Sequence, residues 1–307
     1  AAGAGTGISA KFIERGGAQF AMEGSCMPNP HTRDEVLARL HRTLDDGRPI
    51  IAAGAGTGIS AKFIERGGAD LIIIYNSGRF RMSGFGSCAG LLAYGDANQI
   101  VMDMGEREVL PVVKDIPVIA GVNGSDPTRR MWHFLKQVDA MGFSGVNNFP
   151  TVGVIDGHFR VTLEETGMGF YTEVDMIRIA SEMGLFTIVY VFNAEESRAM
   201  AEAGADVIIA HCSTTVGGSI GVGTAMSLDD AAQLVQTVID AGREKKSDTL
   251  FLSHGGPIAT PSDAAYINQN TDAVGFVGAS SLERFATEAS VEALTREFKA
   301  IPLDRSE

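Results

Sequence analysis

The sequence predicts an α/β fold of the (β/α)8 TIM-barrel class with an N-terminal covering helix, and three observations lead to this prediction. From Arg48 onward, short apolar runs alternate with amphipathic stretches. The runs are rich in β-branched residues and nearly continuous, as in parallel strands covered on both faces. Eight such units over about 250 residues have the size of a TIM barrel. A doubly wound sheet, which usually has fewer strands and a clear fingerprint glycine loop, is the alternative.

The apolar runs give the expected strands, at residues 49–53, 69–75, 117–122, 145–149, 186–192, 206–210, 249–253 and 273–277. Amphipathic periodicity gives the expected helices, which include residues 128–141, 172–183, 194–203, 227–241 and 262–270. Glycines stand between several helices and the next strand, where a helix C-cap belongs: Gly67-Gly68, Gly142, Gly184 and Gly204. Two connections, 76–98 and 150–172, are too long for simple turns, and long loops in a compact domain are usually lids or interface elements.

The start of the chain contains a copied segment, because residues 1–18 repeat residues 52–69 letter for letter. Repeats that build a fold occur several times and differ at solvent positions, so we interpret residues 1–26 as a non-native extension and residues 27–307 as a single barrel domain. A second loop copy that occupies a neighbouring site is the alternative. After the extension, Thr32 and Glu35 form a capping box for a helix over 32–44. Its apolar face predicts that it covers the N-terminal end of the barrel.

Composition excludes several classes of function. The net charge of −13 argues against nucleic acid or an anionic membrane as the main partner. The three cysteines are widely spaced, so neither a disulfide framework nor a metal motif is expected. No apolar run has the length of a membrane span, and no basic-then-apolar signal peptide opens the chain. We therefore expect a soluble, cytoplasmic protein.

The second strand leads into a segment suited to an anionic ligand. It ends in Asn76-Ser77-Gly78-Arg79, at the end of a barrel strand where chemistry is normally located. Glycine allows the backbone to approach a ligand closely, and arginine presents a planar fork that matches carboxylate or phosphate. Ser77, Gly78 and Arg79 are therefore predicted to bind substrate.

The loops after the seventh and eighth strands predict a second anion-binding element. They contain Gly255, Gly256, Gly278 and Ser280. Barrels often hold a phosphate with backbone N–H groups of these two loops and a helix N-terminus. The alternative is that the glycines form close-packed turns and that Ser280 or Ser281 caps the following helix.

Four residues are candidates for proton transfer. His211 and His254 close the sixth and seventh strands, and histidine titrates near neutrality; each has a structural histidine as its alternative. Asp126 follows the third strand and either acts in catalysis or caps the helix over 128–141. Glu165 stands beside glycines in the loop after strand four, where lid closure would bring a carboxylate over the site; a solvated acidic loop is the alternative.

Asparagines at strand ends complete the predicted site. Asn123 follows the third strand, and Asn147-Asn148 closes the fourth. Neighbours on a strand point to opposite sides, so only one of that pair faces the barrel interior. An inward asparagine is costly unless it is satisfied, which favours contact with a ligand or with a metal-bound water. Asn123 and Asn147 are therefore predicted to bind substrate.

Four long motifs resemble those of a known family. They are YNSGRFRMSGFGSCAGLLAYGDAN (75–98), DPTRRMWHFLKQ (126–137), GVNNFPTVGVIDGHFR (145–160) and LEETGMGF (163–170). In these motifs the chain resembles the phosphoenolpyruvate hydrolase-like TIM-barrel proteins, which are grouped with the phosphoenolpyruvate/pyruvate superfamily. The resemblance implies a TIM barrel and Mg²⁺ held by acids at strand ends. Here those ends carry mostly asparagine, with Asp126 as the metal ligand if there is one.

Together, the strand ends and the resemblance predict a hydrolase or lyase that acts on a small anionic keto or enol acid of the phosphoenolpyruvate or phosphonopyruvate type. The alternative is a non-catalytic barrel that senses a metabolite in signal transduction. Related barrels commonly assemble, so a homo-oligomer is expected by analogy.

Overall fold

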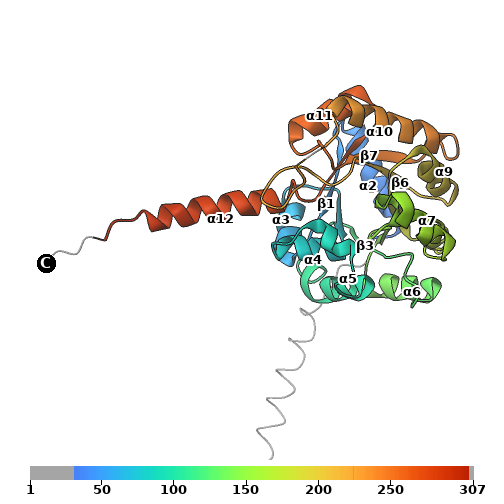
Figure 1. Ribbon diagram of the computed structural model, residues 1–307, viewed down its shortest axis with the longest axis horizontal. Helices are drawn as coiled ribbons and strands as arrows, with labels where there is room; N and C mark the ends of the chain where they lie inside the picture. The colour runs from blue at the N-terminus through green and yellow to red at the C-terminus, as the bar shows by residue number, and fades with distance from the viewer. Residues whose placement is uncertain (1–30, 224, 304–307) are drawn as a thin grey trace, which may run out of the picture.

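The computed structural model describes residues 31–223 and 225–303, and its core is a closed barrel of eight parallel strands in sequential order (Figure 1). The predicted TIM-barrel class is confirmed, and the doubly wound alternative is wrong because β8 pairs with β1 and closes the sheet. The proposed extension, residues 1–26, lies outside the described residues. The strands are β1 (Ile50–Gly54), β2 (Leu71–Ile74), β3 (Val118–Gly121), β4 (Gly145–Asn147), β5 (Phe186–Val191), β6 (Val207–His211), β7 (Leu250–His254) and β8 (Gly275–Gly278).

The strands are apolar throughout because each has two buried faces. In β2, Leu71 and Ile73 belong to the cluster inside the barrel, with Tyr75 directly after the strand, whereas Ile72 and Ile74 belong to the cluster under the helices. Burying each of these isoleucines contributes about 2 kcal/mol. The period of two therefore determines which residue at a strand end faces the barrel mouth.

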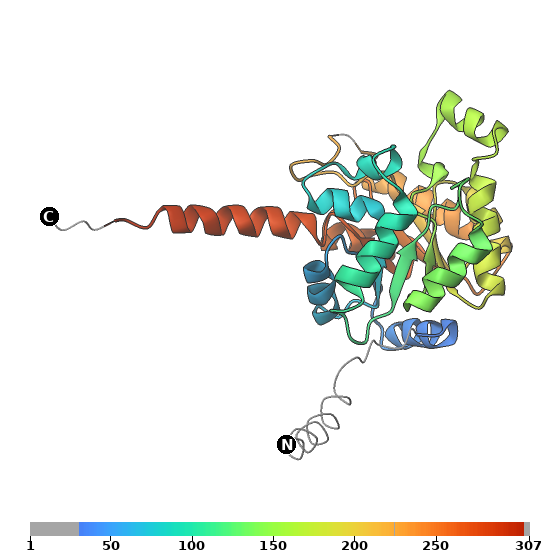
Figure 2. The ribbon, with the colours of Figure 1, turned by 90° about the horizontal axis from the view of Figure 1, so that it is seen from below.

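The helices after the strands mostly lie around this barrel, and the last of them projects away from it (Figures 1 and 2). They are α3 (Gly58–Arg66), α4 (Asn76–Met82), α5 (Ala97–Met104), α6 (Met131–Met141), α7 (Gly157–Glu165), α8 (Phe170–Glu182), α9 (Ala194–Glu202), α10 (Leu228–Arg243), α11 (Pro261–Asn270) and α12 (Arg284–Lys299). Gly68, Gly142, Gly184 and Gly204 have positive φ just before the next strand, so these chain reversals need glycine. No helix in the described part of the chain has the length and apolar character needed to cross a bilayer.

The helix α2 (Arg33–Asp45) closes the N-terminal end of the barrel, as expected. Thr32 and Glu35 form the predicted capping box, and Val36 and Leu40 are buried in the interior cluster. Arg33 pairs with the buried Asp206 at 2.6 Å and so fixes the helix beneath the strands. The opposite end, where the strands finish, is left for the functional site.

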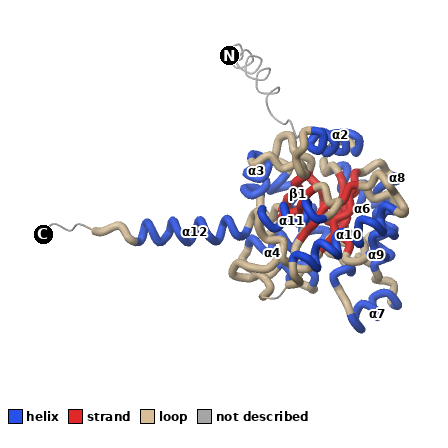
Figure 3. The backbone as a smooth tube through the Cα atoms, turned by 90° about the horizontal axis from the view of Figure 1, so that it is seen from above, coloured by secondary structure: helices blue, strands red, loops and turns tan. Residues whose placement is uncertain are grey.

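The two long connections are not simple loops. The first contains α4, the short helix η1 (Ser87–Leu91) and the start of α5, which continues into the π-helical turn η2 (Gly105–Val109). The second contains η3 (Val152–Val154) and α7, and α7 projects beyond the strand ends on the side opposite α2 (Figure 3). The sequence did not indicate α4 because a seven-residue helix with a central glycine carries too little amphipathic periodicity.

Candidate active site at the carboxyl ends of the strands

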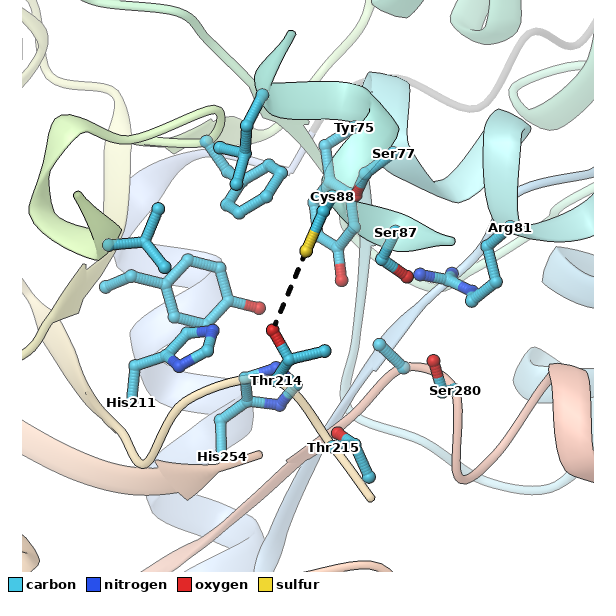
Figure 4. Close-up of a pocket in the computed structure, with 15 residues that line it drawn as sticks. Tyr75, Ser77, Arg81, Ser87, Cys88, His211, Thr214, Thr215, His254 and Ser280 are labelled. Carbon is cyan, nitrogen blue, oxygen red and sulfur yellow. Dashed lines mark hydrogen bonds between the residues drawn. The ribbon is translucent and has the colours of Figure 1, made fainter. Parts of the chain in front are cut away.

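The inward-facing residues at the strand ends form the floor of a pocket (Figure 4). Each of them follows the inward-facing apolar residues of its strand at a spacing of two, so it also points into the barrel. Five of these six residues carry an aromatic or imidazole ring and the sixth is alanine: Tyr75, Phe149, Tyr190, His211, His254 and Ala279. The rings are in contact, with centroids 5.1 Å apart for Tyr190 and His211 and 5.3 Å apart for Tyr190 and His254. The floor is therefore well packed.

Five hydroxyl-bearing residues contribute to the wall of the pocket, beside apolar residues such as Leu91 and Val154. Ser77 comes from the first turn of α4, Ser87 from η1, Thr214 and Thr215 from the loop after β6, and Ser280 from the loop after β8. The Sγ of Cys88 lies 4.0 Å from the Oγ1 of Thr214 across the mouth (Figure 4). The cavity between these walls has a volume of about 60 Å³. A cavity of this size with these donors suits only a small polar ligand.

His211 and His254 form a pair because their strands are in register. β6 and β7 place the two residues opposite each other, with ring centroids 4.6 Å apart in an edge-to-face arrangement. The Ser213 N–H donates to Nδ1 of His211 at 3.1 Å, so the proton of that ring is on Nε2. Nδ1 of His254 donates to the Val277 carbonyl at 2.6 Å, so its Nε2 carries a lone pair. The pair therefore presents one N–H donor and one basic nitrogen.

Both imidazoles are neutral at physiological pH. Burial holds the pKa of His211 well below its usual value, and the neighbouring His254 lowers it further. Burial lowers the pKa of His254 to about 4; the bond to Val277 opposes this shift and the charge of Arg81 adds to it. A neutral imidazole accepts or donates a hydrogen bond without a charge to neutralise, which suits proton transfer to and from a guest.

A buried ion pair stands beside the histidines. The Nη2 of Arg81 lies 2.6 Å from Glu283, and both side chains are only 1% exposed. The other carboxylate oxygen of Glu283 accepts the Gly56 N–H at 2.7 Å. Burial tends to lower the pKa of Arg81, but Tyr75 and Glu283 outweigh it and raise the pKa above its usual value. The pair ties together the ends of β1 and β8 and helix α4, and it keeps a compensated positive charge at the pocket.

The hydroxyl of Tyr190 has no hydrogen-bond partner among the described residues, although the side chain is 1% exposed and lines the pocket. Burial raises the pKa of this hydroxyl well above its usual value, and the adjacent Tyr75 adds to the shift. An unpaired buried hydroxyl costs about 1–3 kcal/mol. This cost is removed when a guest in the pocket bonds to Tyr190.

Four of the residues predicted from the sequence meet in this pocket, namely Ser77, His211, His254 and Ser280. Gly78 lies next to it, where its carbonyl packs against Gly56 so closely that a Cβ on Gly56 would lie 2.1 Å from the oxygen. Neither serine after β8 caps α12, because Glu283 occupies the N-cap position. Ser280 is therefore available to a ligand.

The predicted glycines after β7 and β8 bring the loops close together. A Cβ on Gly255 would lie 2.2 Å from the Ser213 carbonyl, and one on Gly278 would lie 2.5 Å from Leu282. Gly256 has a φ of +56°, and its N–H donates to the Ser213 carbonyl at 2.8 Å. This N–H is therefore already used in packing the β7 loop under the β6 loop. Gly256 therefore forms a close-packed turn, which was the alternative to anion binding. Anion binding by the other backbone N–H groups of the loops after β7 and β8 stays a prediction.

Two charged candidates lie outside the pocket. Arg79 pairs with Glu108 at 2.5 Å, with about one third of each side chain exposed. Arg79 and Arg81 are two residues apart on α4, which turns their side chains by about 200°, so only one of them faces the barrel. Glu165 is exposed at the last residue of α7. The structure therefore puts Arg81, rather than Arg79, beside the histidines.

Asp126 and Asn123 line a neighbouring hollow between the loops after β2, β3 and β4. Asp126 does not cap α6, whose N-cap is Arg130. Asn147 is the inward member of its pair; its Nδ2 donates to the Ile188 carbonyl at 2.8 Å and its Oδ1 has no partner among the described residues. Asn147 lies below the pocket floor, and a ligand contact by it stays a prediction.

The residues of the site do not fit a magnesium ion. The described residues contain no cluster of three or more histidine, cysteine or acidic side chains with metal-binding geometry. Both carboxylate oxygens of Asp126 are engaged, Oδ1 by Thr128 and Oδ2 by Asn98 at 3.0 Å and Arg129 at 3.1 Å. Hydrogen bonds and the arginine hold the pKa of Asp126 below its usual value against the effect of burial.

The sequence analysis missed Tyr75, Arg81, Tyr190, Thr214 and Glu283. The sequence did contain a signal for the two tyrosines. Every second residue of β2 and β5 faces the barrel interior, and Tyr75 and Tyr190 are the next residues in these two series. Arg81 needed knowledge of the helix that turns it inward. Glu283 is 202 residues from Arg81, so no local pattern links them.

A closed barrel of eight parallel strands with a pocket at the carboxyl ends of its strands defines the (β/α)8 barrel class. Within that class, the chain belongs to the phosphoenolpyruvate hydrolase-like family, whose model matches residues 35–301. This confirms the resemblance carried by the four motifs.

Two curated relatives come from Solanum lycopersicum. The chain is 54% identical to the ToMV resistance protein Tm-1(GCR237) over 273 residues, which is 89% of this chain and 36% of that protein. It is also 54% identical to the ToMV susceptible protein tm-1(GCR26) over 270 residues, 88% of this chain and 36% of that protein. The chain thus spans little more than a third of the length of these relatives.

Solved structures share the fold. A phosphonopyruvate hydrolase in complex with oxalate and Mg²⁺ aligns with a TM-score of 0.55 at 19% identity, covering 90% of this chain and 93% of that chain. The 2,3-dimethylmalate lyase, a member of the PEP mutase/isocitrate lyase superfamily, aligns with a TM-score of 0.54 at 16% identity, covering 88% and 91% of the two chains. At these identities the likeness concerns the barrel architecture alone.

Proposed function

We propose that the chain binds a small keto or enol acid of the phosphoenolpyruvate or phosphonopyruvate type in the pocket and cleaves it, as a hydrolase or lyase. The observation that carries this proposal is the neutral pair of His211 and His254, with one N–H donor and one basic nitrogen on the floor of a hydroxyl-lined pocket. Membership of the family supports the substrate class.

The carboxylate of the guest would be bound by hydroxyl donors backed by a positive charge. Ser77 lines the pocket from helix α4, and Thr215 and Ser280 line it from the loops after β6 and β8. The ion pair with Glu283 uses Nε and Nη2 of Arg81, which leaves Nη1 for the guest. Hydrogen bonds from several fixed hydroxyls select a small planar acid by shape, because a larger ligand would separate the loops.

The histidines supply the proton transfers. In the hydrolase, Nε2 of His254 would remove a proton from water, and the hydroxide would form a bond to phosphorus as the P–C bond of phosphonopyruvate or the P–O bond of phosphoenolpyruvate breaks and pyruvate enolate leaves. In the lyase, Nε2 would remove the proton of a substrate hydroxyl, whose oxygen becomes a carbonyl as the adjacent C–C bond breaks and an enolate leaves. The proton would then pass from His254 to the enolate, which restores the neutral ring. His211 Nε2–H and the hydroxyl of Tyr190 donate hydrogen bonds to the oxyanion that develops. A neutral imidazole is a suitable donor to an enolate because it needs no counter-charge.

A substrate panel tests this proposal. The chain is incubated with phosphoenolpyruvate, phosphonopyruvate, oxaloacetate and dimethylmalate, and products are followed by ¹H and ³¹P NMR. We expect His254→Gln to lower turnover of an accepted substrate by about 10²–10⁴-fold, the usual contribution of a general base. His158→Gln, the same change at an exposed histidine, should keep the wild-type rate. Equal rates in the two variants would remove His254 from the mechanism.

A regulatory barrel that binds the same acid without cleaving it is the second candidate. Two observations favour it: the carboxylates nearest the pocket, Asp126 and Glu283, are already hydrogen-bonded, and the tomato relatives are named for virus resistance or susceptibility rather than for a reaction. Thermal stabilisation by members of the panel without any product would support this candidate.

A further inference from the structure

The hollow next to the pocket offers much more space than the pocket itself. Its volume is about 540 Å³, against about 60 Å³ for the pocket. It lies between the loops after β2, β3 and β4, and Asn123 and Asp126 are among its lining residues. The proton transfers assigned to His211 and His254 use none of them. Because the pocket holds little more than the head of a keto acid, a longer chain has to leave it.

The pocket and the hollow share walls. Leu91 of η1 lines both of them. Before it in the chain, Cys88 lines the pocket, and after it, Leu92 lines the hollow. The segment after β4 is divided in the same way, because Val154 lines the pocket and Ile155 lines the hollow. A chain that leaves the pocket past Leu91 therefore enters the hollow.

Helix α7 presents an apolar side to this hollow. Phe159 and Leu163 lie one helical turn apart and both line it, and Met168 lines it from the turn after the helix. None of the residues of α7 is buried, and Phe159 is 62% exposed. The helix projects beyond the strand ends (Figure 3). The apolar side of α7 therefore faces the hollow rather than a packed core, which is typical of a surface that a ligand covers.

The polar side chains on the β3 side of the hollow already bond to one another. The Ser125 hydroxyl donates to Oδ1 of Asn123 at 3.0 Å, and the Thr128 hydroxyl donates to Oδ1 of Asp126 at 2.6 Å. Side chains that are paired in this way do not need a polar guest to satisfy them. The apolar contacts are therefore what a guest in the hollow can add.

The pocket and the hollow differ in charge. Arg81 lines the pocket, and no carboxylate from the described part of the chain does. The hollow has the reverse arrangement, with Asp96 and Asp126 in its lining and no lysine, arginine or histidine among the described residues that form it. Arg129 lies 2.5 Å from Asp96 and 3.1 Å from Asp126, so one guanidinium compensates two carboxylates. The pocket therefore favours an anionic group, whereas the hollow favours a neutral one.

We propose that the hollow binds a neutral aliphatic tail of the substrate, and that the preferred guest is a 2-keto acid with a chain longer than that of pyruvate. Its carboxylate lies beside Arg81 in the pocket, its chain passes Leu91, and its tail packs against Phe159 and Leu163. This binding mode rests on the proposed function for its carboxylate end, and it narrows the substrate class to acids that carry a carbon chain. A phosphoryl group in the hollow would meet carboxylates and no cation.

A homologous series of 2-keto acids tests the tail site. Isothermal titration calorimetry of the whole chain gives the dissociation constants of pyruvate, 2-oxobutanoate, 2-oxohexanoate and 2-oxooctanoate. We expect binding to tighten by about two- to fourfold for each added methylene group, the usual effect of burying one. The acid 2-oxoadipate has six carbons like 2-oxohexanoate but a charged end, and it should bind more weakly than 2-oxohexanoate.

Two positions on α7 provide a matched pair of variants. Phe159→Ser removes the ring that faces the hollow and should weaken binding of 2-oxooctanoate by about tenfold, with pyruvate binding unchanged. Val161→Ser also removes an apolar side chain of α7, but two residues along, where the helix turns it away from Phe159 and it does not line the hollow; it should change neither affinity. Val161 and Phe159 are 50% and 62% exposed, so both variants should fold.

A charge placed in the hollow should reverse the preference for a neutral tail. Leu163→Lys puts a cation beside the tail, so this variant should bind 2-oxoadipate more tightly than 2-oxohexanoate. Val161→Lys adds the same charge on α7 outside the hollow and should keep the wild-type preference.

The outcomes separate the tail site from the site for the carboxylate. Equal affinities for pyruvate and 2-oxooctanoate would overturn the tail site and leave the proposed function in place. A dependence on chain length that is the same in Phe159→Ser and in the wild type would overturn it too, because the tail would then lie elsewhere. If none of the acids binds, the proposed function fails together with the tail site.

Discussion

His254 is held by a backbone carbonyl rather than by a carboxylate, and this single contact determines its behaviour. A carboxylate partner would raise the pKa of the ring, whereas the Val277 carbonyl fixes the tautomer and lets burial lower the pKa to about 4. The sequence indicated that the residue stands at a strand end but gave no information about this partner. The assignment of His254 as a neutral base therefore depends on the fold.

The low pKa of His254 makes stability depend on pH. The usual value is 6.5, so between pH 6.5 and pH 4 the unfolded chain binds a proton that the folded ring refuses. This contribution is zero above pH 6.5, and the free energy of unfolding falls by up to about 3 kcal/mol as the pH drops to 4. Urea unfolding at pH 7.0 and 4.5 should show a smaller difference for His254→Gln than for the wild type. His158→Gln should keep the wild-type difference; an unchanged difference in His254→Gln would show that the buried ring is not neutral.

At the scale of elements, the contact between the β1–α3 turn and α4 positions the site. Gly56 and Gly78 meet there, and the Gly56 N–H is held by Glu283. The run Gly54-Ala55-Gly56-Thr57-Gly58 makes the turn from β1 onto α3, and Thr57 caps that helix. The glycines of this run mainly allow two backbone segments to approach each other closely. The same glycine-rich sequence could also bind an anion, so the motif alone does not tell the two roles apart.

Alanine substitutions at these two glycines should differ. A Cβ on Gly56 would lie 2.1 Å from the Gly78 carbonyl, so Gly56→Ala must separate the two segments and should cost about 1–3 kcal/mol. Gly78→Ala places its Cβ 3.1 Å from backbone atoms of Ala55 and Gly56, a tight contact but a much milder one than 2.1 Å, and alanine inside α4 favours helix by about 1 kcal/mol, which offsets this strain. Thermal unfolding should therefore show a clear loss for Gly56→Ala and little change for Gly78→Ala. Equal losses would mean that the close approach is not the cause.

At the scale of the whole molecule, the sequence was sufficient for the barrel and for half of the site. Continuous apolar runs identified all eight strands, because burial on both faces leaves a strong signal in a parallel sheet. His211 and His254 could be predicted because they close two of these runs, at the end of the barrel where sites are located. Arg79 was predicted and Arg81 was missed because residues 76–98 were expected to form a loop. In a loop, unlike a helix, sequence spacing does not tell which side chains point the same way. The outward direction of α12 depends on contacts with Gly217 and Ser219, distant in sequence, and had no local signal.

Imidazole NMR during a titration with oxalate tests most directly whether the histidine floor binds a small anion. Oxalate is the anion in the phosphonopyruvate hydrolase structure that shares the barrel fold. We predict saturable shifts of the His211 and His254 ring signals at the same oxalate concentration, with exposed His133 and His158 unchanged. Ring signals of His211 and His254 that stay unchanged, or that move no more than those of the exposed histidines, would contradict the account.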